Sequence, residues 1–415
     1  MTCADFVKPE YGSRCFSEIP QLVEHLLVDG PAPPLPAEIL DATSADCEAV
    51  VLFFVDAFGW RFFEKYRDQY PFLDRVSRTG AVTQLTSQFP STTTAHVTCV
   101  HTGLPVGQSG LFEWNYYEPA LDTIIVPLMY SFAGQRERGT LTAAGVDPAQ
   151  ILPTRTIYRE LKRQGVRSFA FQPRAHMGSA YAWTTFKGAS VIPYTTLAEG
   201  LVNLGAKLEG RQGPAYYFFY FDGIDSIGHQ YGPTSEQIEA EIDTFLTILD
   251  RLFAQRLQGK LDKTLLLLTA DHGMVETDPG RTLYLNRGET LAGAERYLKT
   301  NRKGELLVPG GGSCRDMFLY IREELLEEAH DFLAERLEGR AEVRLVREMA
   351  AEGYFGPEPF APEFAARAGD LVILPYKNES VWWYEKGKFE QKYWGHHGGL
   401  TPEEMEIPLL LWNFT

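Results

Sequence analysis

The 415-residue chain is predicted to be an α/β protein: a three-layer sandwich with a mostly parallel central sheet flanked by helices, plus a smaller inserted cap. Apolar runs rich in Val, Leu, Phe and Tyr recur between Gly, Pro or Asp, and helical patterns lie between the runs. The runs are continuous rather than alternating, which is typical of strands buried on both faces of a sheet. They lie at 49–55, 166–171, 215–221, 264–270, 316–321, 370–375 and 407–412.

The clearest helical pattern covers residues 235–257. Thr234 and Gln237 have the spacing of a capping box, which favours a helix start at this point. Further helices are predicted over 155–164 and 321–339. One face of the 235–257 helix is apolar and is formed by Ile238, Ile242, Phe245, Leu249, Leu252 and Phe253.

The order of these patterns predicts one principal domain interrupted by an insertion. Residues 1–274 form its first part, with an N-terminal extension over 1–45 that contains a stiff Pro-rich linker at 31–38. Residues 275–390 are interpreted as a cap that partly continues the sheet. Residues 391–415 complete the principal domain.

Composition excludes several classes of protein. A net charge of −16 argues against a nucleic acid polymer as partner. No apolar run approaches the roughly 20 residues that cross a bilayer, and the N-terminus does not resemble a signal peptide. The five cysteines are odd in number and show no CxxC pairing, so we expect free thiols and a cytoplasmic location. The oligomeric state does not follow from the sequence.

Potential metal ligands follow several of the predicted strands. In open α/β sheets, ligands bind beyond the carboxyl ends of the strands, so these side chains are expected to meet at one edge. A single Asp at a strand end often only caps the next helix. Three such positions, two with a nearby His, favour a ligand cluster instead: Asp56 in VVLFFVDAFG, Asp225 and His229 in YYFFYFDGIDSIGH, Asp271 and His272 in LLLLTADHGM, and His397 in YWGHHGGL.

Local spacing is compatible with joint coordination. Asp225 and His229 are four residues apart, which on a helical turn presents both side chains to one ion. Adjacent residues on a regular strand point to opposite faces, so Asp271 and His272 act together only if the chain turns there, and Gly273 permits such a turn. In GHHGG, His396 competes with His397 for the last position.

A hydroxyl nucleophile is expected at the start of a helix in FPSTTTAHVTCV. Pro90 ends a strand, and Ser91 to Thr94 offer caps for a helix that reaches about residue 102. A hydroxyl at this position feels the positive end of the helix dipole and free backbone N–H groups, which favour an alkoxide and a phosphate anion. Spacing alone does not choose among the four hydroxyls, and Ser91 or Thr92 is also expected to cap the helix.

Five motifs in order, VDAFG, FPSTT…HTGLP, DxxGHxxGP, TADHGM and HHGG, resemble the alkaline phosphatase superfamily. The closest resemblance is to its nucleotide pyrophosphatase/phosphodiesterase (type I phosphodiesterase) branch. The resemblance covers about 49–119, 215–275 and 390–412. The formylglycine motif of the sulfatases is absent, and the longer ligand set of the phosphoglycerate mutases cannot be traced.

This resemblance implies specific roles. In that branch the nucleophile lies ten residues before the Gly of the TG pair, and counting back from Gly103 gives Thr93. An Asn that holds a phosphate oxygen is expected about 21 residues after the nucleophile, where this chain has Trp114, with Asn115 next to it. By the same resemblance, one metal is bound by Asp225, His229 and His397, and a second by Asp56, Asp271, His272 and the Thr93 oxygen.

The resulting hypothesis is a hydrolase of phosphodiester or pyrophosphate bonds that acts through a phosphothreonine at two divalent cations. Mixed His and Asp ligands suit zinc best, with manganese and iron as alternatives. The substrate is a small phosphate ester, with a nucleotide among the candidates. A phosphomonoesterase, a phosphonate hydrolase and a metal-binding module without turnover are the competing readings.

Two features near this site stay open at the level of sequence. The aromatic loop LFEWNYYEP (111–119) is compatible with stacking of a base or aryl group and equally with a packed lid. Arg315 in GGGSCRD is interpreted as a surface arginine rather than a phosphate contact.

Overall fold

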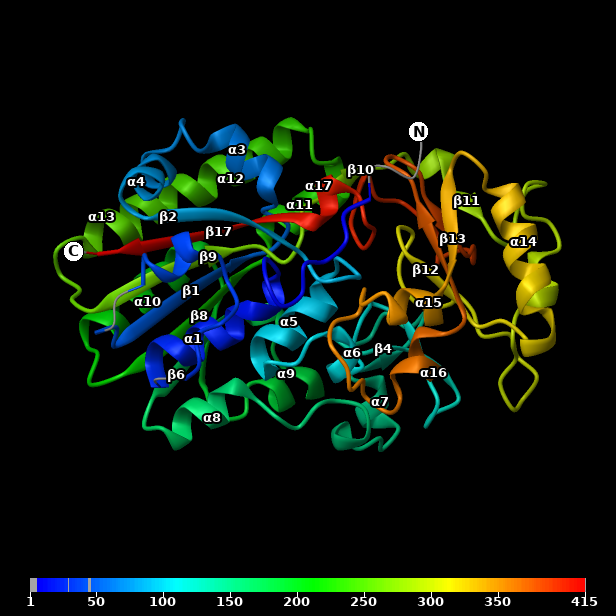
Figure 1. The fold of residues 1–415 in the computed structure, drawn as a ribbon, viewed down its shortest axis with the longest axis horizontal. Helices are drawn as coiled ribbons and strands as arrows, with labels where there is room; N and C mark the ends of the chain where they lie inside the picture. Colours follow the sequence, from blue (N-terminus) through cyan, green and yellow to red (C-terminus); the bar gives the residue numbers. More distant parts are fainter. Residues whose placement is uncertain (1–5, 29, 44–45, 415) are drawn as a thin grey trace.

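In this computed structural model, which describes residues 6–28, 30–43 and 46–414, the chain has two parts (Figure 1). A large α/β part contains the central sheet, and a smaller part rich in short strands lies beyond one end of it. The sheet has seven strands in the order β2 (Ala81–Thr86), β17 (Glu406–Asn413), β9 (Thr264–Thr269), β1 (Ala49–Val55), β8 (Ala215–Phe221), β6 (Arg167–Pro173) and β7 (Ser190–Tyr194).

The predicted fold class is confirmed. β1 pairs in parallel with both β8 and β9, and β6 pairs in parallel with β7 and β8. Only β17 runs antiparallel to its two neighbours among these strands. Every residue of β1, β8 and β9 is buried, which explains why their sequences are continuously apolar rather than alternating.

Helices cover both faces of the sheet, as Figure 1 shows for α3, α4 and α12 on one side and α1, α5 and α8 on the other. The first layer consists of α3 (Trp60–Tyr66), α4 (Pro71–Thr79), α10 (Leu197–Glu209), α11 (Gly223–Tyr231), α12 (Glu236–Leu249) and α13 (Gln255–Leu257). The second consists of α1 (Ile19–Val28), α5 (Thr93–Thr102), α8 (Ile157–Arg163) and α9 (Ala180–Thr185). Two further helices are short. α2 (Ala37–Leu40) contacts β2, and α17 (Pro402–Met405) directly precedes β17 in the sequence.

The predicted helices exist, with shorter bounds or different caps. The 235–257 pattern corresponds to α12, a π-helical turn over Asp250–Ala254 and α13. Its N-cap is Ser235, whose side chain accepts a hydrogen bond from the Ile238 N–H, so the predicted Thr234 capping box is wrong. Thr234 instead donates to Glu276. The 321–339 pattern corresponds to a 3-10 turn, Glu323–Leu325, followed by α14 (Leu326–Arg336).

The 275–390 segment does not extend the central sheet through any strand that the structure describes, in contrast to the expectation. β12 (Met317–Leu319), β14 (Leu371–Pro375) and β13 (Ala341–Leu345) form a separate antiparallel sheet. The apolar runs at 316–321 and 370–375 are therefore strands of a second hydrophobic core. Around them lie β11 (Leu283–Tyr284), paired with β15 (Val381–Trp382), and the helices α14, α15 (Val346–Ala351) and α16 (Phe364–Ala368).

Two further small elements border the end of the central sheet. β3 (Tyr116–Glu118), β4 (Thr123–Val126) and β5 (Ser131–Phe132) form an antiparallel sheet, flanked in sequence by α6 (Val106–Ser109) and α7 (Thr140–Ala143). β10 (Val275–Glu276) pairs with β16 (Gly395–His396), which ties the two ends of the insertion together. The domain boundaries at 274 and 391 stay predictions.

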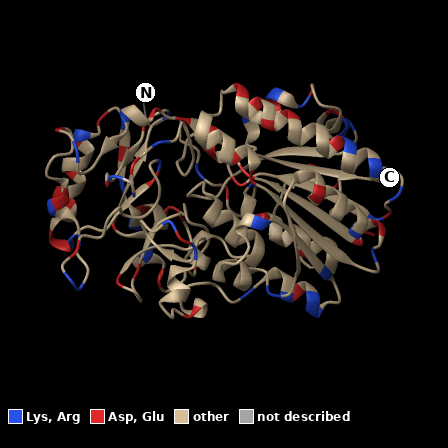
Figure 2. Ribbon diagram, turned by 180° about the vertical axis from the view of Figure 1, so that it is seen from behind, with Lys and Arg blue, Asp and Glu red and all other residues tan. Residues whose placement is uncertain are grey.

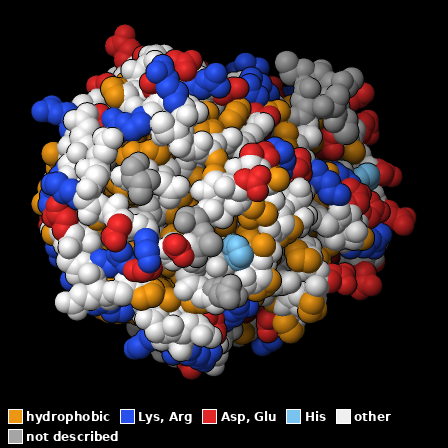
Figure 3. Space-filling model, turned by 60° about the vertical axis from the view of Figure 1, so that its left-hand side comes forward, with side chains coloured by type: hydrophobic (Ala, Val, Ile, Leu, Met, Phe, Trp, Pro, Cys, Tyr) orange, Lys and Arg blue, Asp and Glu red, His pale blue; other side chains and the backbone are white. Residues whose placement is uncertain are grey.

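Charge lies mainly on the outer helices and loops, as Figure 2 shows. On the face in Figure 3, acidic and basic side chains are interspersed with scattered hydrophobic ones. Within the described residues, no helix combines the length and apolar character needed to span a bilayer. The four cysteines in the same residues, Cys15, Cys47, Cys99 and Cys314, are free, and Cys3 lies outside them.

Candidate metal centre

Three neighbouring strands bring five of the six predicted ligands to one edge of the sheet, and His397 comes from the segment after β16. Asp56 directly follows β1, Asp271 closely follows β9, and β8 leads into α11, which carries Asp225 and His229. Because β9, β1 and β8 are adjacent and parallel, their carboxyl ends lie side by side. The site therefore lies where open α/β sheets bind ligands.

The first ligand group consists of Asp56, Asp271 and His272. Their ligand atoms lie within 4.8 Å of one another, and all three side chains are buried. His272 Nε2 is 3.3 Å from Asp271 Oδ2 and 3.5 Å from Asp56 Oδ1. This geometry suits a single cation held between the three side chains.

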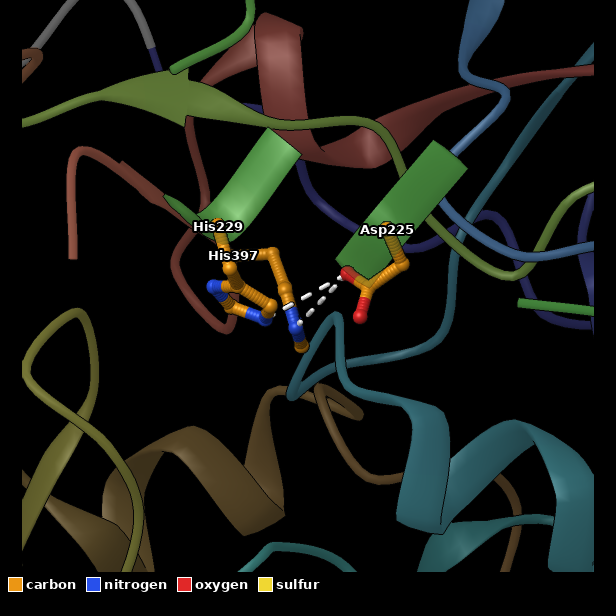
Figure 4. A group of neighbouring side chains, drawn as sticks. All are labelled: Asp225, His229 and His397. Carbon is orange, nitrogen blue, oxygen red and sulfur yellow. Dashed lines mark ion pairs between the residues drawn. The ribbon is translucent and has the colours of Figure 1, made fainter. Parts of the chain in front are cut away.

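The second ligand group consists of Asp225, His229 and His397, again within 4.8 Å of one another. Figure 4 shows both imidazoles directed at the Asp225 carboxylate. Asp225 Oδ1 is 3.3 Å from His229 Nε2, one helical turn away on α11, and 3.7 Å from His397 Nε2. The neighbouring His396 is buried and does not join the group.

The two groups are in direct contact. The rings of His272 and His397, one from each group, stack with their centroids 3.6 Å apart. The predicted convergence of six side chains from distant parts of the sequence is thus present in the structure. Their roles as ligands stay a prediction.

All three imidazoles present Nε2 to the site and bind a backbone carbonyl through Nδ1. Nδ1 of His229, His272 and His397 lies 2.7 to 3.0 Å from the backbone carbonyl of Gly395, Gly273 and Ser91, respectively. A carbonyl accepts a hydrogen bond, so Nδ1 carries the proton and Nε2 keeps its lone pair. This orientation is the usual one for a metal-binding histidine.

Each carboxylate keeps at least one oxygen free. Tyr220 donates its hydroxyl to Asp56 Oδ2, and the N–H groups of Ala57 and His272 donate to Asp271 Oδ1. The remaining oxygens, Asp56 Oδ1, Asp271 Oδ2 and Asp225 Oδ1, are buried without a hydrogen-bond donor. Buried acceptors without a donor are costly, and a bound cation would satisfy all three.

Electrostatics at the site also favour bound cations. Burial, together with repulsion from neighbouring carboxylates, raises the pKa of Asp56 well above its usual range. Burial raises the pKa of Asp271 to about 7 and also raises that of Asp225. Burial holds the pKa of His272 and His397 well below its usual value, so these imidazoles stay neutral. Neutral imidazoles and a concentration of negative charge are what a divalent cation requires.

Glycine allows the chain to pack tightly behind the first group. A Cβ on Gly273 would lie 2.1 Å from the Glu403 carbonyl oxygen, and a Cβ on Gly59 would lie 2.5 Å from Gly273 Cα. The loop after β9 therefore has no room for a side chain at 273. Close approach of the backbone, in addition to the expected turn, explains this glycine.

Among the four hydroxyls considered for the nucleophile, only Thr93 is not buried. It is the first residue of α5, and its Oγ1 lies 3.3 Å from His272 Nε2. Ser91 donates to the Gly399 carbonyl, and Thr94 Oγ1 is buried without a partner. Thr92 occupies the N-cap position, but no side chain caps the helix, so the expected cap is absent.

Trp114 and Asn115 both line a cavity of about 690 Å³ that also contains Thr93. Trp114 is 41% exposed, whereas Asn115 is buried and its backbone bridges to Gly312. Phe112 and Tyr116 of the same loop are fully buried. The aromatic loop therefore packs as a wall and presents only Trp114 broadly to solvent, and phosphate binding by Asn115 stays a prediction.

Arg315 is not a surface arginine, in contrast to the expectation. It is fully buried and forms a two-pronged ion pair with Glu404, with nitrogen–oxygen distances of 3.0 and 2.9 Å. It also donates to the carbonyls of Tyr376 and Glu379. Arg315 thus joins the cap to α17, which follows His397 in the sequence.

A second cavity, which the sequence did not reveal, lies beside Thr93. It measures about 200 Å³, and its polar lining includes Arg138, Gln172 and a close His176–Asp222 pair. Arg138, Gln172 and His176 come from the middle of the chain, where no motif was recognised. Asp222 lies in a quoted segment but was not singled out there. Tyr220, which holds Asp56, was missed as well, because its position in an aromatic strand carries no distinguishing signal.

Comparison with known proteins identifies the family of the chain. The profile of the type I phosphodiesterase/nucleotide pyrophosphatase family matches residues 50–400, so the chain belongs to that family. Mouse ectonucleotide pyrophosphatase/phosphodiesterase family member 1 is 23% identical over 69% of this chain. Venom phosphodiesterase CdcPDE of Crotalus durissus collilineatus is 23% identical over 57% of it. The matched region spans 30% and 27% of these relatives, less than a third of their length.

Solved structures share the fold at low sequence identity. Murine ectonucleotide pyrophosphatase/phosphodiesterase 5 superposes with a TM-score of 0.63 at 19% identity, over 87% of both chains. An inactive threonine-to-alanine variant of the same murine protein, solved with AMP, gives 0.61 at 18% identity, again over 87% of both chains. Phosphonoacetate hydrolase from Sinorhizobium meliloti 1021, solved with phosphonoacetate, gives 0.60 at 17% over 88% of this chain and 90% of that one.

Proposed function

We propose that this protein is a metal-dependent hydrolase that cleaves phosphodiester or pyrophosphate bonds through a phosphothreonine at Thr93. One observation carries the proposal. The only unburied hydroxyl of its segment lies 3.3 Å from His272 Nε2, beside two contiguous ligand groups that hold three buried, unpaired carboxylate oxygens. Family membership supports the same reaction class.

Two divalent cations fit the donor set. Each group supplies carboxylate oxygen together with imidazole nitrogen, a mixture that suits zinc best, with manganese or iron as alternatives. When bound, such ions supply Lewis acidity that neutralises the phosphate and lowers the pKa of oxygen ligands. Asp56, Asp271, His272 and Thr93 would hold one ion, and Asp225, His229 and His397 the other.

The chain itself positions the nucleophile. Thr93 begins α5, so its hydroxyl and the phosphate face the free N–H groups and the positive end of the helix dipole. In the first half-reaction the Thr93 Oγ–P bond forms as the P–O bond to the leaving group breaks, and the threonine proton is transferred to the departing alcohol. In the second, a water oxygen bonds to phosphorus, the Oγ–P bond breaks, and Thr93 regains a proton. The sum is one diester plus water giving one monoester plus one alcohol.

The substrate is proposed to be a small phosphate ester. A nucleotide is the first candidate, supported by the AMP complex of the murine relative. A phosphonate hydrolase or phosphomonoesterase is the alternative, since the phosphonoacetate hydrolase shares the fold. We also propose a cytoplasmic location, supported by the free thiols of Cys15, Cys47, Cys99 and Cys314.

The proposal is tested by metal analysis combined with paired assays. The purified protein is reconstituted with zinc, manganese or iron, and kcat/KM is measured for p-nitrophenyl phosphate and bis(p-nitrophenyl) phosphate. We expect metal-dependent turnover with preference for the diester. Equal or better turnover of the monoester would favour the alternative, and a metal-loaded protein without turnover would reject the enzymatic proposal.

A further inference from the structure

His96 is a buried histidine of α5 that the proposed reaction does not use. It follows Thr93 by three residues, and none of its surface is exposed. The Phe16 ring packs edge-on against the imidazole, with the ring centroids 4.7 Å apart. Burial lowers the pKa of His96 to about 3, so the ring stays neutral. The hydrogen bonds of this neutral ring show which parts of the chain it holds together.

Both ring nitrogens of His96 have backbone partners. Nδ1 lies 2.7 Å from the Thr92 carbonyl, so Nδ1 carries the proton and donates it there. Nε2 therefore keeps its lone pair, and it accepts the Gln88 N–H at 2.9 Å. Thr92 directly precedes the proposed nucleophile, and Gln88 lies in the segment between β2 and α5. One side chain thus fixes the entry to α5 at two points.

The same imidazole reaches the loop of the first ligand group through Ser87. The Ser87 hydroxyl lies 2.9 Å from His96 Nε2 and 2.7 Å from the backbone carbonyl of Asp271. Both of these atoms accept hydrogen bonds, so the hydroxyl bridges them. Asp271 and His272 supply two of the three side chains of the first ligand group. His96 is therefore connected both to the residue before Thr93 and to the loop that carries these two ligands.

The separation that this network sets is the one on which the proposed reaction depends. Thr93 Oγ1 lies 3.3 Å from His272 Nε2, beside the first ligand group. A displacement of about 1 Å at a reacting atom can lower a rate about a hundredfold. Groups that orient metal ligands from behind contribute about 10–100-fold to metal affinity or activity. A rigid connection between Thr93 and the Asp271 loop is therefore expected to affect both quantities.

We propose that His96 is a positioning residue that holds the Thr93 hydroxyl at its place beside the first ligand group. It does so through the Thr92 carbonyl on one side and through Gln88 and Ser87 on the other. His96 exchanges no proton with the substrate in this role. The inference rests on the proposed function and adds to it a residue that neither touches substrate nor binds a cation.

The kinetic test uses substitutions that keep one end of the imidazole or the other. Asn reproduces the reach of Nδ1 but not that of Nε2, whereas Gln reproduces the reach of Nε2. At saturating zinc, His96→Asn should lower kcat for bis(p-nitrophenyl) phosphate about ten- to hundredfold and leave KM within about threefold. His96→Gln keeps the connection to Gln88 and Ser87, so its kcat should stay within about fivefold of the wild type.

Ser87→Ala tests the route of the connection. The substitution removes the hydroxyl between His96 and the Asp271 carbonyl and should lower kcat at least about threefold. Because both changes interrupt one route, the double variant with His96→Asn should lose less than the product of the two single losses. Losses that multiply would show that the two side chains act independently, and they would overturn the inference.

Zinc affinity is a readout that is independent of turnover. In an Asp225→Asn background, which lacks one ligand of the second group, His96→Asn should weaken zinc binding at least about tenfold. His101→Asn is the matched control. His101 is also a buried histidine of α5, but its Nδ1 bonds to the Tyr158 hydroxyl instead of this network. Zinc affinity in the control should stay within about twofold, as measured by competition with a chromogenic chelator.

The outcomes separate the inference from the proposed function. Wild-type-like kcat and zinc affinity in His96→Asn overturn the inference and leave the proposed function standing, as do equal losses of zinc affinity in His96→Asn and His101→Asn. If His96→Asn does not fold, Ser87→Ala carries the test, and an unchanged kcat in that variant overturns the inference. Absence of turnover by the metal-loaded wild type overturns the proposed function and the inference with it.

Discussion

The carboxylates of the candidate metal centre, of which Asp225 is partly exposed, and those of two buried ion pairs differ in what neutralises them. Glu404 is bonded by Arg315, by the Gly399 N–H and by the Thr401 hydroxyl. Glu118 is bonded by Arg367. At the candidate metal centre, one oxygen of each of Asp56, Asp225 and Asp271 has no hydrogen-bond donor. The protein supplies its own cation where the charge is structural and leaves acceptors unpaired where we propose an external cation.

The largest expected effect is a loss of turnover at the candidate metal centre without a loss of stability. Thr93→Ala should lower turnover at least about 10³-fold, because it removes the atom that attacks phosphorus. Its stability should stay within about 1 kcal/mol, since the hydroxyl has one long contact, with His272. Thr94→Ala is the matched control: its hydroxyl, one residue further on, has no partner, and turnover should stay within about tenfold. Wild-type-like turnover of Thr93→Ala would remove Thr93 from the proposed role.

The second prediction concerns the buried ion pair between Arg315 and Glu404. Arg315→Ala should lower the free energy of unfolding by about 3–5 kcal/mol, because it leaves Glu404 as a buried, uncompensated charge. Arg163→Ala removes an exposed pair with Glu160 and should cost less than about 1 kcal/mol. Urea unfolding of both variants measures the difference. Similar small losses in the two would show that the buried pair is not what fastens the cap.

Metal removal is the complementary experiment at the candidate metal centre. Chelation should leave the protein folded but less stable, because the buried carboxylates then repel one another. Adding back a divalent cation at about 100 times its dissociation constant should restore about 2.7 kcal/mol per site. Calorimetry of the chelated and reconstituted protein follows the change. A melting temperature that does not respond to metal would contradict the proposal that external cations neutralise these carboxylates.

Glu113 represents a third kind of buried carboxyl group, with neither a basic partner nor a proposed cation. Glu113 faces Asp316 without a basic partner, and burial raises the pKa of Glu113 from 4.5 to about 7. A raised pKa means that the folded state holds this proton more tightly than the unfolded chain, so stability falls as the pH rises between about 4.5 and about 7. Glu113→Gln should remove this dependence, on the order of 3 kcal/mol across the window. Parallel pH profiles of the two proteins would argue against a protonated Glu113.

Much of the architecture could be read from the sequence because buried parallel strands and their polar ends leave a local signal. The apolar runs located β1, β8 and β9, and the Asp and His residues beyond them marked the edge where they meet. Thr93 and His397, however, were chosen over neighbouring residues only through a family resemblance. The structure supplies a physical reason for both: Thr93 is unburied beside His272, and His397 Nε2 faces Asp225.

Other features are set by long-range contacts that leave no local signal. Arg315 lies in a Gly-rich loop that looks exposed, and its burial depends on Glu404, which is 89 residues away. The runs at 316–321 and 370–375 have the composition of central strands, but they pair with each other in a separate sheet. The smaller cavity is lined by residues of α5, α9 and the ends of β6 and β8, so no single segment of the sequence predicts it.

The most direct test of the account counts divalent cations per chain by native mass spectrometry. The wild-type protein, reconstituted with zinc, should bind two, whereas Asp271→Asn and Asp225→Asn, each lacking a ligand of one group, should retain one. A wild type that binds none, or variants that bind as many as the wild type, would contradict the claim that the unpaired carboxylates are cation ligands.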